Sequence, residues 1–445
     1  MSSASSGLRR QPLGLALLTG AVMTSILGGG IFDLPQNMAA GAGLGAIVLA
    51  WILTFAGMCA LANAFRLLAC LRPDLKAGIY AYAREGFGPL AGFEIAWGYW
   101  LSAVFGNVAF AVLIQRTARY FFPALEDHAA LSILSGSLLI WIMHGIVLFG
   151  VKRALVLNLT SSMLNLVMIG VILALMARAV KMERLLFDFW GARAQLGSVL
   201  TQLKSTMLVT LWTFIGVEGA VVLSGRALKP AHIGVATFAG LAICAGLYVS
   251  MSVLPFGLMT QPELAGLAAP SAASVLRNVL GTGGQMLVMA SLLVTLLNSW
   301  LAWTILVSEL PYEAAQGGVF PKFLARTNRF GAPAPALWIS SGLMQVMLFI
   351  AWGVEDIWRW LISMTGVMIL PSYLASAAYL WRCAFKNHLA SEISRRQIYV
   401  SGALGVAYSG WLLYAAGPKF VLMSVLLFAL GLPVYRSVCT SDAAG

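Results

Sequence analysis

Long stretches without charged residues alternate along the chain with short polar segments. Four of these stretches contain no Asp, Glu, Lys or Arg: Leu34–Phe65, Ala154–Ala177, Asn278–Ser308 and Phe330–Val354. Each can cross a bilayer, because a hydrocarbon core of about 30 Å requires roughly 20 apolar residues in a helix. The pattern therefore predicts an all-α polytopic membrane protein.

Cuts at the charged and Pro/Gly-rich segments divide the sequence into about twelve membrane spans. The spans are 13–38, 43–66, 89–115, 129–150, 154–178, 198–225, 232–257, 281–314, 332–353, 358–382, 398–416 and 420–436. The pattern thus predicts a cytoplasmic tail at 1–12, a membrane domain at 13–436 and a second cytoplasmic tail at 437–445. Most Lys and Arg residues then lie on the cytoplasmic side, as the positive-inside rule requires.

Composition agrees with this picture and excludes other classes of protein. Hydrophobic residues make up 60% of the chain and charged residues 10%, whereas charged residues are about 25% of an ordinary soluble domain. The net charge is +12, but the basic residues are dispersed among loops, so nucleic acid is not an expected partner. The sequence contains no nucleotide-binding loop, no metal-ligand spacing and no nucleophile–base pair, so neither a cofactor nor an enzyme activity is expected.

The first and sixth spans share an interruption at membrane depth. The first contains Gly28, Gly29 and Gly30, and the sixth combines two glycines with a carboxylate in Trp212–Gly219. A glycine costs a helix about 1 kcal/mol relative to alanine, and a broken helix survives in a membrane only where it lines a protein cavity. Paired breaks predict two inverted five-helix repeats, at 13–178 and 198–382, with two extra helices at 398–436. The alternative is close helix packing, but that favours glycines spaced three or four residues apart.

The breaks also indicate what such a cavity would bind. A half-helix beginning near Gly30 presents unpaired N–H groups and its positive dipole end, so Gly28, Gly29 and Gly30 are predicted to hold a carboxylate. Free carbonyls near Ile26 and Ile215 would accept hydrogen bonds from an ammonium group. Together these groups fit the head group of an amino acid.

Five side chains inside or near the ends of the spans are further candidates. Glu218 is an ionisable group beside a break and is interpreted as a gate or a proton-responsive switch, or alternatively as a fastener between helices. Asp33 and Glu94 lie nearer the membrane edges and are weaker candidates. Trp212 and Trp303 offer indole faces that attract cations, although either could simply pack against neighbouring helices.

Five motifs, taken together, resemble the amino acid, polyamine and organocation superfamily. They are Gly28–Phe32, Leu34–Ala39, Gly78–Arg84, Gly86–Gly88 and Trp212–Glu218. Within that superfamily the chain is similar to the basic amino acid/polyamine antiporters, and most similar to arginine/ornithine antiporters. The resemblance implies a twelve-helix fold with a five-plus-five inverted repeat, alternating access, a bacterial inner-membrane location and a homodimer.

The resemblance also implies a substrate site. Ile26 and the three glycines match the unwound first helix, where many members have a serine in place of Gly29. Trp212 matches a gating tryptophan, Ile215 a backbone ligand, Glu218 a gating carboxylate and Trp303 the aromatic residue that stacks on a guanidinium. Other implied lining residues are Tyr99, Asn107, Phe110, Thr365 and Tyr373.

These inferences favour electroneutral exchange of L-arginine for L-ornithine. The alternatives are exchange of arginine for agmatine or of lysine for cadaverine, and a proton- or sodium-driven basic amino acid permease. A substrate sensor that does not transport is a further alternative. Basic amino acids or polyamines and the lipid bilayer are the expected partners.

Overall fold

The computed structural model describes residues 12–443, except for 77, 125–128, 353–356 and 386–392. The first half of the described chain forms α1 (Leu15–Ile26), η1 (Gly29–Asp33), α2 (Leu34–Ala39), α3 (Leu44–Leu71), α4 (Ile79–Phe87), α5 (Pro89–Ala118), α7 (Ala129–Leu148), α8 (Val151–Ala179) and α9 (Met182–Phe187). The second half forms α10 (Val199–Thr213), α11 (Gly219–Val222), η2 (Leu223–Arg226), α12 (Pro230–Val253), η3 (Leu254–Gly257), α13 (Gln261–Ala265), α14 (Ser271–Gln316), η4 (Lys322–Ala325), α15 (Ala334–Trp352), α16 (Ile357–Cys383), α17 (Arg395–Ala416), α18 (Pro418–Ala429) and α19 (Leu432–Ala443).

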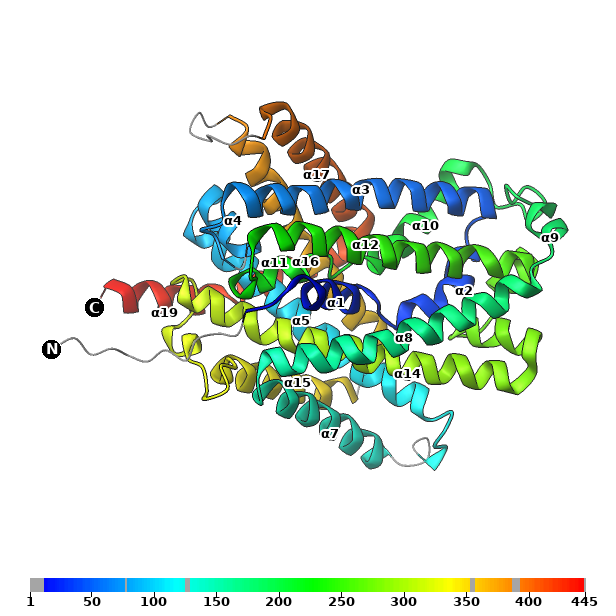
Figure 1. Ribbon diagram of the computed structural model, residues 1–445, viewed down its shortest axis with the longest axis horizontal. Coiled ribbons are helices and arrows are strands. Elements are labelled where there is room, and N and C mark those ends of the chain that lie inside the picture. The colour runs from blue at the N-terminus through cyan, green and yellow to red at the C-terminus, as the bar shows by residue number, and fades with distance from the viewer. Residues whose placement is uncertain (1–11, 77, 125–128, 353–356, 386–392, 444–445) are drawn as a thin grey trace.

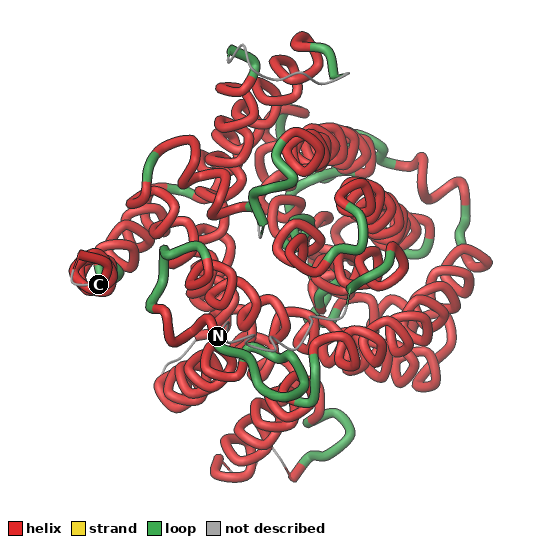
Figure 2. The backbone as a smooth tube through the Cα atoms, turned by 60° about the vertical axis from the view of Figure 1, so that its left-hand side comes forward, coloured by secondary structure: helices red, strands yellow, loops and turns green. Residues whose placement is uncertain are grey.

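The long helices lie side by side along one direction (Figure 1), and a second view shows many of them closer to end-on (Figure 2). Among the described residues, ten helices are long and apolar enough to cross a membrane, or eleven if the bent pair α1–α2 counts as one span. The prediction of an all-α polytopic membrane protein is confirmed. The sixth predicted span, 198–225, fails this test because its longest helix, α10, has only 15 residues.

Two predicted boundaries differ from the structure. The span expected at 281–314 is part of α14, which runs from Ser271 to Gln316 and is kinked at Gly281, where φ is 65°. Glycine permits this left-handed backbone conformation. The sequence on either side of Gly281 does not indicate that the helix continues across it. The span expected at 420–436 is formed by α18 and α19, which together make one candidate span from Pro418 to Cys439.

The order of elements repeats along the chain. An interrupted helix, a long helix, a short helix and three further long helices occur first as α1/η1/α2, α3, α4, α5, α7 and α8. The same order returns as α10/α11, α12, α13, α14, α15 and α16. This order agrees with the predicted five-plus-five arrangement, while the division at residues 178 and 198 stays a prediction.

The interrupted first helix occupies the interior of the bundle. α1 contacts α8, α12 and α14, and its second half, from Gly20 to Ile26, is buried throughout. Large exposed apolar side chains are instead found on peripheral helices, as at Leu422 and Leu426 of α18. Such apolar side chains suit a lipid-facing surface.

Candidate substrate-binding site

The break in the first span leaves carbonyl groups that side chains of neighbouring helices satisfy. α1 ends at Ile26, η1 begins at Gly29, and the two parts are bent by 46°. The Tyr248 hydroxyl of α12 donates to the Ile26 carbonyl at 2.7 Å, and the Trp303 indole of α14 donates to the Ser25 carbonyl at 3.0 Å. The end of the half-helix is therefore held by two helices that surround it, as broken membrane helices require.

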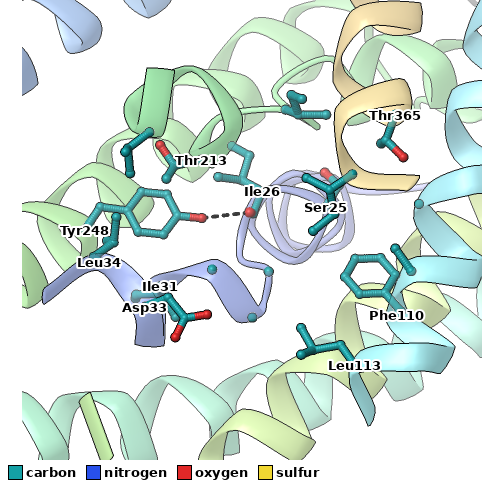
Figure 3. Close-up of a pocket in the computed structure, with 18 of the residues that line it drawn as sticks. Ser25, Ile26, Ile31, Asp33, Leu34, Phe110, Leu113, Thr213, Tyr248 and Thr365 are labelled. Atoms are coloured by element: carbon teal, nitrogen blue, oxygen red, sulfur yellow. Dashed lines mark hydrogen bonds between the residues drawn. The ribbon is translucent and has the colours of Figure 1, made fainter. Parts of the chain in front are cut away.

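These bonds correct one expectation. The Ile26 carbonyl was predicted to be free, but it already accepts a hydrogen bond from Tyr248, a residue that the sequence reasoning did not single out (Figure 3). A carbonyl oxygen has two lone pairs, so one acceptor position remains for a ligand.

The break in the sixth span lies directly against the first. α10 ends at Thr213, and the helix resumes at Gly219. Between them, Gly216 has a φ of 106°, and its carbonyl accepts a hydrogen bond from the Ser25 hydroxyl at 2.7 Å. A Cβ atom at Gly216 would lie 2.4 Å from the Ser25 carbonyl oxygen. Glycine is therefore required here by both its backbone angle and the close approach of the two breaks.

A cavity of about 410 Å³ opens beside these breaks (Figure 3). This volume is within the range of about 300–1,000 Å³ typical of small-molecule sites. The lining is mostly apolar and comes from both breaks and from α5, α12, α14 and α16. It consists of Ser25, Ile26, Gly28, Gly29, Gly30, Ile31, Asp33, Leu34, Asn37, Gly106, Ala109, Phe110, Leu113, Val209, Thr213, Ile215, Tyr248, Trp303, Ile362 and Thr365.

Eight of the predicted site residues line this cavity: Ile26, Gly28, Gly29, Gly30, Phe110, Ile215, Trp303 and Thr365. Tyr99, Asn107 and Tyr373 do not, and they lie buried outside the lining. Trp212 belongs to the last turn of α10, but its side chain is outside the part of the chain that the structure describes. The role of each residue in binding stays a prediction.

The three glycines differ in their surroundings. A Cβ at Gly29 would lie 2.8 Å from Leu296 and 3.0 Å from Leu113, so this glycine permits close packing. A Cβ at Gly30 would meet nothing within 4 Å, and one at Gly28 would only touch Phe110 at 4.0 Å. Gly28 and Gly30 therefore leave the cavity open, while Gly29 lets η1 approach its neighbours.

Glu218 is bonded to groups on three sides and does not line the cavity. Its carboxylate is fully buried and accepts hydrogen bonds from the Tyr99 hydroxyl at 2.9 Å, from the Tyr373 hydroxyl, and from the Gly216 amide at 3.2 Å. These partners come from α5, α16 and the break itself. The arrangement fits the fastening role that the sequence left open, and a gating role remains a prediction.

Asn107 contrasts with Glu218, because its side-chain amide forms no hydrogen bond within the described structure. Its side chain is fully buried, and neither amide atom has a hydrogen-bond partner within the described structure. Buried amides are normally paired. Asn107 directly follows the cavity-lining Gly106 on α5.

The sequence reasoning missed several lining residues. Tyr248 and Thr213 share their helices with other polar residues, such as Ser250 and Thr210, so polarity alone does not single them out. Ile362 and Leu113 carry no signal either, because one aliphatic residue in an apolar helix looks like another. Among the described residues, no group of three His, Cys, Asp or Glu side chains is arranged to hold a metal ion.

Two interrupted helices that meet at a cavity inside a helical membrane bundle are typical of secondary transporters. Comparison with known proteins gives the family. The amino acid permease family model matches residues 13–438, and the chain therefore belongs to that family, within the amino acid, polyamine and organocation superfamily.

Several proteins named as arginine/agmatine antiporters are similar over almost the whole chain. The protein of Chlamydia abortus is 46% identical over 432 residues, which cover 95% of this chain and 89% of that protein. The proteins of Chlamydia caviae and Chlamydia pneumoniae are 46% and 45% identical, with 96% and 95% of this chain covered and 90% and 89% of theirs. The chain is thus a multi-pass membrane transporter and not an enzyme.

Proposed function

We propose that this protein is an antiporter of basic amino acids that exchanges L-arginine for agmatine. The observation that carries the proposal is the cavity at the two breaks, where the glycines at the start of η1 and the Trp303 indole border one space. The relatives named as arginine/agmatine antiporters, at 46% identity, support the choice of substrates.

The chemistry of the lining supports recognition of a free amino acid. The N–H groups at the start of η1 have no earlier turn to bond to, so they are donors for a carboxylate. The remaining lone pair of the Ile26 carbonyl and the Ile215 carbonyl are acceptors for an ammonium group. Trp303, 4% exposed at the cavity wall, offers its face to a guanidinium, an interaction of about 2 kcal/mol when desolvated.

At one end of the molecule, segments distant in sequence are joined by a buried ion pair. The end that carries the chain termini has a buried Arg226–Glu309 ion pair with N–O distances of 2.6 and 2.8 Å, and α4 and α11 also lie there (Figure 1). Gly30 and Asn37, on the other side of the break, are exposed. With cytoplasmic termini, as the positive-inside rule predicts, this arrangement supports assignment to the outward-facing state of an alternating-access cycle.

Exchange of arginine for ornithine, the pair favoured by the sequence alone, is the rival. Arginine and ornithine are both monocations, whereas agmatine is a dication, so only exchange with agmatine moves net charge. A bacterial inner-membrane location, polyamines as further substrates and a homodimer all stay predictions.

The test uses purified protein in liposomes that are loaded in turn with agmatine, ornithine or buffer. We expect internal agmatine to stimulate uptake of labelled arginine, and an imposed membrane potential to change the rate. Stimulation by ornithine alone, with no response to potential, would favour the rival pair. Uptake into empty liposomes driven by a proton or sodium gradient would identify a permease instead.

A further inference from the structure

Asp33 is the one charged residue among the described residues that line the cavity. It is the last residue of η1, a 3₁₀-helix that begins at Gly29. Residues three apart in a 3₁₀-helix lie on the same face, so Asp33 stands one turn beyond Gly30. Because a Cβ on Gly30 would meet nothing within 4 Å, the space beside this face is open.

The Asp33 carboxylate is only partly engaged by the protein. Its Oδ1 accepts a hydrogen bond from the Ser271 amide, at the start of α14, at 3.3 Å. None of the ion pairs between described residues involves Asp33. In Figure 3 the side chain extends from η1 toward the side on which Leu113 of α5 lies. The carboxylate is thus half-buried, charged and short of partners at the exposed end of the cavity.

A purely structural role explains part of this arrangement. Asp33 places a negative charge at the first residue of α14, where a carboxylate stabilises a helix N-terminus. That role uses one oxygen and requires no cavity. It does not explain why the carboxylate lies one turn from the glycines that are proposed to bind the substrate's own carboxylate, since two like charges so close disfavour each other.

The exchange of an amino acid for its decarboxylated product would explain the position of the Asp33 carboxylate. In the proposed site, the carboxylate of an amino acid accepts hydrogen bonds from the N–H groups near Gly28 and Gly30. The product has no carboxylate, so those donors lose their partner, and a site built from them alone would bind the product weakly. A fixed carboxylate nearby offers the product's cationic end a different partner.

We propose that Asp33 is a specificity-determining residue that favours dicationic amines lacking an α-carboxylate over the parent amino acid. The inference rests on the proposed function, since it assumes that a cationic substrate occupies this cavity. Asp33 attracts the ammonium group of the amine and repels the carboxylate of the amino acid. It thereby brings the affinities for the two substrates of the exchange closer together.

The test measures binding of agmatine and of arginine to the purified full chain and to Asp33→Asn by titration calorimetry. Asparagine keeps the oxygen that accepts from Ser271 and removes the charge, so α14 retains its cap. We expect the Kd for agmatine to rise about tenfold, as loss of one partly screened charge pair predicts. The Kd for arginine should stay within about threefold or fall, and Asp33→Glu should restore part of the agmatine affinity.

Glu183→Gln is the matched control. Glu183 is exposed in α9, and its substitution removes the same unit of charge without altering the cavity, so both affinities should stay unchanged. Equal effects of Asp33→Asn on both ligands, or no effect, would overturn the role of Asp33 and leave the proposed function standing. If the unmodified protein binds neither ligand, the proposed function itself fails.

Discussion

Trp303 shows how a single side chain in the cavity wall is fixed before any substrate is bound. Its indole nitrogen donates to the Ser25 carbonyl at 3.0 Å, and its ring stacks on Tyr99 with centroids 6.1 Å apart. The same residue thus closes the end of a broken helix and presents an aromatic face. Tyr99, predicted to touch the substrate, supports the indole from outside the lining.

Replacing Trp303 with leucine should weaken cation binding more than it weakens the fold. We expect the Kd for arginine to rise about tenfold, because a desolvated cation–π contact contributes roughly 1–2 kcal/mol. Binding and melting temperature would be measured on the same detergent-solubilised sample. Unchanged affinity in well-folded protein would count against a stacking role.

Trp300→Leu is a suitable comparison for that variant. Trp300 is on the same helix, fully buried, and absent from the cavity lining. Its substitution should lower the melting temperature through lost packing and leave the affinity of the surviving folded protein close to normal. An equal loss of affinity in both variants would indicate a general effect of disturbing α14.

Gly216 carries the tightest steric requirement in the two breaks. In Gly216→Ala, a left-handed backbone and a contact of 2.4 Å to the Ser25 carbonyl should together destabilise the protein by about 2 kcal/mol or more. The variant should give less monodisperse protein and a lower melting temperature. Gly246→Ala in α12, where a Cβ would meet nothing within 4 Å, should behave like the unmodified chain; a normal Gly216→Ala would contradict the described geometry.

At the scale of elements, the two breaks are joined to each other and to the helices around them. Ser25 bonds to Gly216 across the breaks, Tyr248 bonds α12 to α1, and Glu218 joins α5 and α16 to the second break. A movement of either interrupted helix therefore requires these bonds to rearrange. Because the Ser25–Gly216 hydrogen bond connects the two breaks, we expect them to move together.

Glu218→Gln tests which role the carboxylate has at the second break. The glutamine amide keeps one acceptor oxygen, but its NH₂ group would face hydroxyl or amide groups that donate to Glu218. We therefore expect a stability loss of about 1–3 kcal/mol. Exchange rates as a function of pH give the second readout. A pH profile altered from that of the unmodified protein supports a proton-responsive switch, whereas an identical profile leaves Glu218 as a fastener. Tyr373→Phe, which removes one donor and no ionisable carboxylate, is the control.

The sequence was sufficient to locate both breaks but not the bonds between them. Three adjacent glycines and a mid-span carboxylate are energetically unfavourable in a membrane helix. Their presence in the sequence therefore indicates an interruption of the helix. In contrast, α12 and the middle of α14 have apolar residues on all sides, so no periodicity indicates which face meets α1. Tyr248 and the packing of Gly29 against Leu296 depend on that facing, and they emerge only in three dimensions.

At the scale of the whole molecule, the end near the termini is held together by contacts between distant segments. Leu13 pairs with Ala227 in a parallel bridge, with its amide donating to Arg226 at 2.8 Å and its carbonyl accepting from Leu228 at 2.9 Å. The Arg226 guanidinium then binds Glu309 at two oxygens and the Gly331 carbonyl at 3.0 Å. Three parts of the chain thus meet at one buried charge pair.

Arg226→Met should strongly destabilise this end of the molecule. Arg226 is 4% exposed and Glu309 is 1% exposed, and loss of one partner from a buried ion pair costs about 3–5 kcal/mol. We expect a lower melting temperature and greater reactivity of cysteines introduced at the termini side of the cavity. The double variant Arg226→Met/Glu309→Leu should recover much of the stability, since it leaves no uncompensated charge; an additive loss would show that the pair is not the source.

The bridge at Leu13 also sets an order of assembly. Leu13 is synthesised more than 200 residues before its partners Arg226 and Leu228, and Glu309 and Gly331 come later still. The residues of the predicted first repeat are therefore synthesised before these contacts can form. The last of these contacts becomes possible at Gly331, before α15 and α16 are made, so a chain that ends before Arg226 lacks all of them.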